Sequence, residues 1–134
     1  MGQILEVRVE QDGASSAVGI VRTHRVAIDR PVAGGGTDKG PLGGEYLLVS
    51  LGGCFMSNLL AASRAREVPV SNVRVAVTAT LASSPNRVTA MTMTIGATGV
   101  DREMLEKLAE IAGRACIVTN TLKLAVPITV TCEP

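Results

Sequence analysis

Two cysteines, Cys54 and Cys116, are the residues whose type and position most clearly indicate chemistry. Each lies in an apolar segment with helical character, and a β-patterned stretch separates them. The thiolate form of cysteine is a strong nucleophile. A zinc site is less favoured by the pattern, because zinc ligands usually show closer spacing such as Cys-x-x-Cys. The pattern therefore predicts a dithiol site built from two core helices. The alternative is that each cysteine is a small apolar side chain packed inside its helix.

The other candidate residues point less clearly to a site. Cys132 shares a predicted strand face with two aliphatic residues, which favours packing in the core. His24 is the only histidine, and a metal site would require it to meet Cys54 and Cys116 from three separate elements. We therefore expect no metal ion.

Length and composition limit the classes of function. The chain has 134 residues, which predicts a single domain over 1–134. Its net charge is +1, from 13 basic and 12 acidic residues spread along the chain, so it has no basic surface typical of nucleic-acid binding. Tyr46 and Phe55 are the only aromatic residues available for base stacking. We expect no nucleic acid as a partner.

The first residues alternate as a strand does and do not resemble a secretory signal, so the expected location is the cytoplasm. Thiols stay reduced there, which favours buried or redox-active cysteines over a disulfide framework. The apolar run 46–62 is short for a membrane span and is interrupted by Ser50, Ser57 and Asn58. We expect no membrane association.

The first third of the chain has the features of a sheet followed by a loop. Alternating apolar and charged residues at 5–10 predict a strand, and a turn follows at 11–13. A second β-rich stretch covers 18–29. Glycine and proline then dominate 31–44, which predicts a connecting loop.

The apolar segment 45–67 predicts a helix that is apolar on nearly every side, which is typical of a helix in the core. Gly52 and Gly53 lie in its middle, and each costs about 1 kcal/mol relative to alanine. This cost indicates that another part of the protein approaches the backbone closely, and a second buried helix is the natural candidate.

The remaining segment predicts a hairpin, a helix and a final strand. Two alternating strands within 73–97 form the hairpin. Asp101 caps an amphipathic helix that carries Cys116 on its buried face and breaks at Thr119, and a strand covers 128–132. This order predicts an α+β architecture. A homodimer would cover a helix that is apolar all round.

Two motifs carry a resemblance to a known family. They are Gly-Pro-Leu-Gly-Gly-Glu-Tyr-Leu-Leu-Val-Ser-Leu-Gly-Gly-Cys at 40–54 and Arg-Ala-Cys-Ile-Val-Thr-Asn-Thr-Leu at 114–122. With the hairpin between them, they make the chain similar over essentially its whole length to the OsmC/Ohr family of osmotically inducible and organic-hydroperoxide-resistance proteins.

The resemblance implies an OsmC-like α+β fold, with antiparallel sheets wrapped around two central helices in an intertwined homodimer. It further implies a peroxidase in which Cys54 attacks a small organic hydroperoxide and Cys116 resolves the product as a disulfide. An external dithiol would then reduce this disulfide, and no bound cofactor is needed.

The chain departs from the family pattern at the residues expected to activate Cys54. Gly44 occupies the place of the family glutamate, with Glu45 one position late, and Gln11 occupies the place of the family arginine. An arginine from the second β-rich stretch or the loop could substitute: Arg22, Arg25 or Arg30. The alternative function is an OsmC-fold binding protein for a small apolar ligand that has lost peroxidatic activation.

Overall fold

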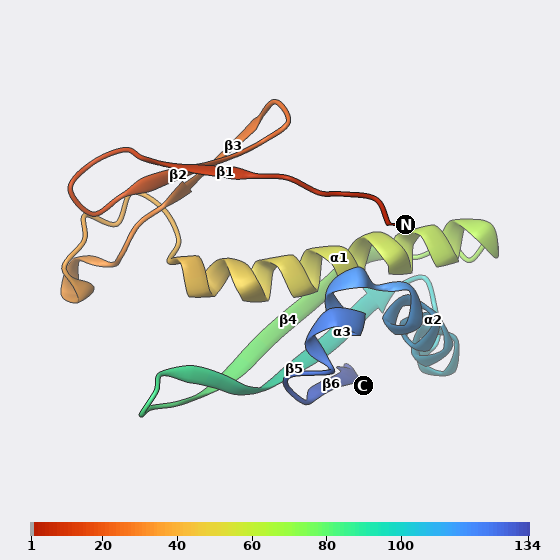
Figure 1. The fold of residues 1–134 in the computed structure, drawn as a ribbon. Helices are drawn as coiled ribbons and strands as arrows, with labels where there is room; N and C mark the ends of the chain where they lie inside the picture. Colours follow the sequence, from red (N-terminus) through yellow and green to blue (C-terminus); the bar gives the residue numbers. More distant parts are fainter. Residues whose placement is uncertain (1) are drawn as a thin grey trace. The chain divides into compact units, whose positions relative to one another are not determined.

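The computed structural model of the protein describes residues 2–134, and these form six strands, three α-helices and one short 3-10 helix (Figure 1). The chain divides into two compact units, of which the first ends at Leu47 and the second runs from Leu48 to Pro134. Helix α1 (Gly43–Ala65) begins in the first unit and continues in the second.

The first unit contains a three-stranded antiparallel sheet in the order β1-β2-β3. Its strands are β1 (Arg8–Gln11), β2 (Ala17–Val21) and β3 (His24–Ile28). Gly19 of β2 pairs with Val9 on one side and with Val26 on the other, so β2 is the central strand.

Two predictions for this sheet were wrong in their boundaries. The first strand begins at Arg8 and not at residue 5, and the stretch 18–29 is two strands joined by a turn at Arg22 and Thr23. Arg22 has a φ of 53°, a left-handed conformation that suits a tight turn. A chain reversal at this point means that 18–29 presents no continuous strand face.

The loop after β3 is held by one buried carboxylate. Asp29 is 2% exposed and accepts hydrogen bonds from two hydroxyl groups and three backbone N–H groups. The Thr37 hydroxyl does most to lower the pKa of Asp29, and burial acts in the opposite direction. Three further donors also lower it: the Lys39 N–H, the Ser15 hydroxyl and the Arg30 N–H. A short 3-10 helix, η1 (Val32–Gly34), lies within this loop.

The second unit contains the other three-stranded sheet, in the order β4-β5-β6. The predicted hairpin is confirmed as β4 (Ser71–Ala82) and β5 (Arg87–Thr98), which pair antiparallel. The predicted final strand is confirmed as β6 (Ile128–Cys132). Strand β6 pairs parallel with β5, so this sheet is not wholly antiparallel. The helices between β5 and β6 supply the crossover that a parallel pair requires.

Two helices follow the hairpin, α2 (Arg102–Ala115) and α3 (Ile117–Leu122). The predicted cap is confirmed, because the Asp101 carboxylate accepts a hydrogen bond from the Met104 N–H at 2.8 Å. Apolar side chains of α1, α2 and β5 are fully buried in this unit: Leu51, Phe55, Leu59, Met91, Met93, Ile95 and Leu108.

One glycine of the pair in α1 lies against a strand, where a second helix was predicted. A methyl group added at Gly52 would lie 3.0 Å from Cγ2 of Val77, so strand β4 approaches the backbone there. No atom outside the helix lies within 4 Å of the corresponding position at Gly53. Val49, on the same helix, is 60% exposed, so much of the apolar surface of α1 is uncovered in a single chain.

Helix α1 is also long and apolar enough to meet the length and hydropathy criterion for a membrane span. Core helices of proteins outside membranes meet the same criterion, and residues of this helix such as Leu51 and Leu59 are fully buried against the rest of the second unit.

Candidate dithiol site

The first thiol of the site comes from the middle of α1, where Cys54 is half-buried. The second comes from the corner between α2 and α3, where Cys116 is fully buried. The prediction that Cys116 lies on the helix starting at Asp101 was wrong, because α2 ends at Ala115 and Cys116 has extended backbone angles, φ −73° and ψ 116°.

The corner forms at Cys116 because its side chain caps the next helix. The Cys116 sulfur accepts a hydrogen bond from the Thr119 N–H at 3.4 Å, in the position where serine or aspartate commonly caps a helix. The Asn120 side chain donates to the Arg114 carbonyl at 2.9 Å and closes the corner from the other side. The predicted break at Thr119 therefore occurs three residues earlier.

The structure brings Cys54 and Cys116 together. The Cys116 thiol and the backbone N–H groups of Ile117 and Val118 lie close enough to the Cys54 sulfur to lower its pKa. The first turn of α3 thus faces Cys54 with its free N–H groups, which interact favourably with a negative charge.

These contacts shift the pKa of the Cys54 thiol. Burial raises the pKa of the Cys54 thiol, but the Val118 N–H, the Cys116 thiol and the Ile117 N–H together outweigh burial and lower it. Within the second unit, the groups that lower this pKa are two backbone N–H groups and a thiol. The thiolate of Cys54, which is the nucleophilic form, is therefore favoured by hydrogen-bond donors.

One polar side chain at this site was missed in the sequence. Asn58, half-buried on α1, places its amide nitrogen 3.8 Å from the Cys54 sulfur and 2.9 Å from the Cys54 carbonyl oxygen. The available signal was its spacing, because residues four apart on a helix lie on the same face.

The family profile described as OsmC-like protein matches residues 36–131, which include both cysteines. The chain belongs to the OsmC-like family. The resemblance carried by the motifs at 40–54 and 114–122 is thereby confirmed.

Solved structures show the same fold over nearly the whole OsmC-like chain. An OsmC-like protein from Mycoplasma pneumoniae superposes with a TM-score of 0.85 at 17% identity, covering 99% of this chain and 98% of that one. One from Vibrio cholerae gives 0.82 at 11% identity, covering 98% and 100%. An organic hydroperoxide resistance protein from Legionella pneumophila gives 0.77 at 13% identity, covering 99% and 100%. Identities this low show a shared fold alone. No curated protein matches the sequence.

The predicted activating residues of this OsmC-like protein all lie in its first unit. Glu45, in the first turn of α1, accepts a hydrogen bond from the Leu42 N–H at 2.8 Å and so caps the helix. Arg22 lies in the turn between β2 and β3, Arg25 lies on β3, and both are exposed. Their roles toward Cys54 stay predictions.

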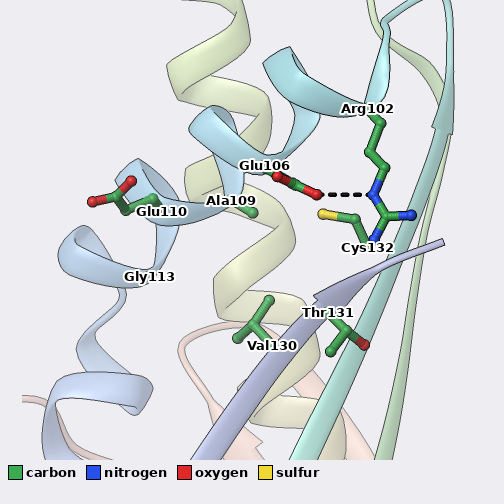
Figure 2. Close-up of a pocket in the computed structure, with 8 residues that line it drawn as sticks. All are labelled: Arg102, Glu106, Ala109, Glu110, Gly113, Val130, Thr131 and Cys132. Carbon is green, nitrogen blue, oxygen red and sulfur yellow. Dashed lines mark hydrogen bonds and ion pairs between the residues drawn. The ribbon is translucent and has the colours of Figure 1, made fainter. Parts of the chain in front are cut away.

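The third thiol of the OsmC-like protein has a different environment. Cys132, on β6, is half-buried and lines a pocket of about 410 Å³, which differs from the predicted packing in the core (Figure 2). Arg102 and Glu106 form an ion pair at 2.8 Å beside it. Burial raises the pKa of Cys132, Glu106 raises it further, and Arg102 opposes both.

Among residues 2–134, no group of three or more His, Cys, Asp and Glu side chains is arranged to hold a metal ion.

Proposed function

We propose that this OsmC-like protein is a cysteine-dependent peroxidase that reduces small organic hydroperoxides in the cytoplasm through a Cys54–Cys116 disulfide cycle. The observation that carries the proposal is the proximity of the two thiols, with the Cys116 thiol among the groups that lower the pKa of Cys54. Membership in the OsmC-like family supports it, since proteins of the same fold include ones described as organic hydroperoxide resistance proteins.

The cycle uses each thiol once. The Cys54 thiolate attacks one oxygen of the hydroperoxide, so that an S–O bond forms and the O–O bond breaks. The alkoxide leaves, takes up a proton and becomes the alcohol, while Cys54 becomes a sulfenic acid. The Cys116 thiol then attacks the Cys54 sulfur, a disulfide forms and water leaves. An external dithiol reduces the disulfide and is itself oxidised.

An organic substrate agrees with the surface next to Cys54. A groove of about 430 Å³ runs between α1 and β4 within the second unit, and Gly53, the neighbour of Cys54, is among its lining residues. The remaining lining is almost wholly apolar: Leu48, Val49, Gly52, Met56, Val75 and Val77. An apolar wall of this kind favours an alkyl or aryl hydroperoxide over hydrogen peroxide.

The same groove is the observation that favours the second candidate function, a binding protein for a small apolar ligand. In that case the thiol pair is inert toward peroxides, and the groove holds the ligand without chemical change. Reaction with a peroxide separates the two functions.

A homodimer is the oligomeric state we propose for the OsmC-like protein. Exposed aliphatic side chains support it in both units: Ile4 is 85% exposed, Leu5 82% and Val49 60%. An intertwined pair of chains would cover these residues.

The test uses reduced protein and cumene hydroperoxide, with peroxide consumption followed in time and the products mapped by mass spectrometry. Wild type is expected to consume one equivalent and to form the Cys54–Cys116 disulfide. Cys54→Ser is expected to lose consumption at least about 100-fold, because the nucleophile is absent. Cys116→Ser should consume one equivalent and stop at a sulfenic acid that dimedone traps.

Cys132→Ser is the matched control, because it removes a thiol with a raised pKa from the same unit. It is expected to behave as wild type. The absence of both peroxide loss and an intramolecular disulfide in wild type would contradict the peroxidase and favour the binding protein.

A further inference from the structure

The side chain of Asn58 contacts the nucleophile that the proposed function assigns. Its amide nitrogen Nδ2 lies 2.9 Å from the carbonyl oxygen of Cys54 and 3.8 Å from the Cys54 sulfur. An amide NH₂ group has two hydrogens, so one nitrogen can donate to both atoms. The bond to the carbonyl fixes the amide, and the second hydrogen is left for the sulfur.

The identity of residue 58 is unusual for its position. Asparagine is among the less favourable residues in the interior of a helix, because its side chain competes for backbone hydrogen bonds. Here it is half-buried in an apolar helix, one turn after Cys54, with its amide directed toward the site. A leucine would fit the helix better and would offer no donor.

The charges around the sulfur give this donor its importance. Within the second unit, the titratable group that lowers the pKa of Cys54 is the Cys116 thiol, and the other groups that lower it are N–H groups of α3. A neutral donor aimed at an anion is a charge-assisted hydrogen bond, which is stronger than a bond between two neutral groups. Donors can therefore perform the task for which the sequence predicted an arginine or a glutamate.

We propose that Asn58 is a further catalytic residue, whose side-chain amide donates to the Cys54 sulfur and stabilises its thiolate. The proposal rests on the proposed function for the role of Cys54, but it concerns thiolate reactivity and can be tested without a peroxide.

The experiment measures the alkylation rate of Cys54 by iodoacetamide from pH 5 to pH 11 in a Cys116→Ser background, where a single thiol titrates at the site. Asn58→Leu is expected to slow alkylation at pH 7 about three- to ten-fold, because a donor to a charged acceptor is lost. At the highest pH, where every thiol is ionised, its rate should equal that of the background protein. Asn58→Asp should be slower still at pH 7, because a carboxylate repels the thiolate.

Ser57→Ala is the matched control, since Ser57 is the exposed neighbour of Asn58 on the same helix, and its rate should not change. Alkylation of Cys132 in the same samples reports on folding of the second unit and should also stay constant. An unchanged rate at pH 7 in Asn58→Leu overturns the proposal. A loss that persists at high pH also overturns it, because it would reflect access and not ionisation.

Failure of the proposed function has a different signature. If wild type consumes no cumene hydroperoxide while Asn58→Leu shows the pH-dependent loss, Asn58 stabilises the Cys54 thiolate in a protein that is not a peroxidase. In the opposite case, wild type consumes the peroxide while the alkylation profiles of Asn58→Leu and the background protein coincide. That result supports the peroxidase function and refutes the role of Asn58.

Discussion

Cys54 and Cys132 lie in the same unit, and their surroundings shift their pKa values in opposite directions. Cys132 has an arginine beside it, yet burial and Glu106 outweigh Arg102 and the pKa of its thiol is raised. For Cys54, N–H and S–H groups of the second unit outweigh burial and lower the pKa. Donors aimed at the sulfur thus have more effect than an arginine whose charge is neutralised by its own partner.

A third acidic group of the protein follows the same rule. Asp29 is buried, and the Thr37 hydroxyl, with further hydroxyl and backbone donors, lowers its pKa without any charged side chain among the causes. The first unit uses this arrangement to hold a loop, and the second unit uses it to hold a nucleophile. The two acceptors differ in their chemistry. A thiolate is a nucleophile that can attack a peroxide, whereas the carboxylate of Asp29, held by five donors, fixes the loop.

Within this comparison, the largest expected effect is the difference in reactivity between the two thiols. At pH 7, Cys54 of wild type should react with iodoacetamide at least about ten-fold faster than Cys132. A thiol with a lowered pKa has a larger thiolate fraction at this pH than a thiol with a raised pKa. Lower intrinsic nucleophilicity of the more acidic thiolate offsets part of this gain. Peptide mapping after timed quenching measures both rates in one sample.

The ratio of the two rates should decrease as the pH rises, because both thiols are then ionised. In guanidinium chloride the two cysteines should react alike, which is the control for intrinsic differences. A faster Cys132 at pH 7 in the folded protein would reverse the comparison.

A smaller effect is expected from the ion pair beside Cys132. Glu106→Gln removes the negative charge that raises the pKa of Cys132, so its alkylation at pH 7 should become about two- to three-fold faster. Arg102→Gln removes the opposing positive charge and should slow the same reaction about two-fold. The rates are measured as above, at low and at high salt.

Both changes should shrink at 1 M salt, because the two side chains are 57% and 55% exposed and are screened by ions. Neither should bring Cys132 to the reactivity of Cys54, since burial is the first cause of its raised pKa. Changes of the same sign in the two variants would show that the charges act through local structure.

Elements with complete local signals were predictable from the sequence. Strand β6 alternates over its whole length and was predicted with its observed boundaries, and Asp101 is a standard helix cap. The family fold followed from the motifs around Cys54 and Cys116. These features depend on residues that are neighbours in the chain.

Features that depend on tertiary contact were not predictable. Helical periodicity continues across the corner at Cys116, and the cap that ends it is a cysteine sulfur, which is not among the usual capping residues. Gly52 indicated a close approach, but only the packing of β4 identifies its neighbour as Val77. The role of Asn58 required the direction of its amide, which spacing alone does not give.

The last prediction concerns whether the donors seen in one chain are the complete surroundings of Cys54. Gly53 is adjacent to Cys54 and has open space beside it, so in a lone chain Gly53→Ala should raise the free energy of unfolding by about 1 kcal/mol through helix propensity. Gly52→Ala has the same propensity gain, but its methyl group would lie 3.0 Å from Val77 Cγ2, so its net effect should be near zero or a loss of about 1 kcal/mol. Urea unfolding of the two variants measures the difference. If Gly53→Ala is instead as destabilising as Gly52→Ala, a second chain packs against this face of α1, and groups from that chain belong to the environment that sets the reactivity of Cys54.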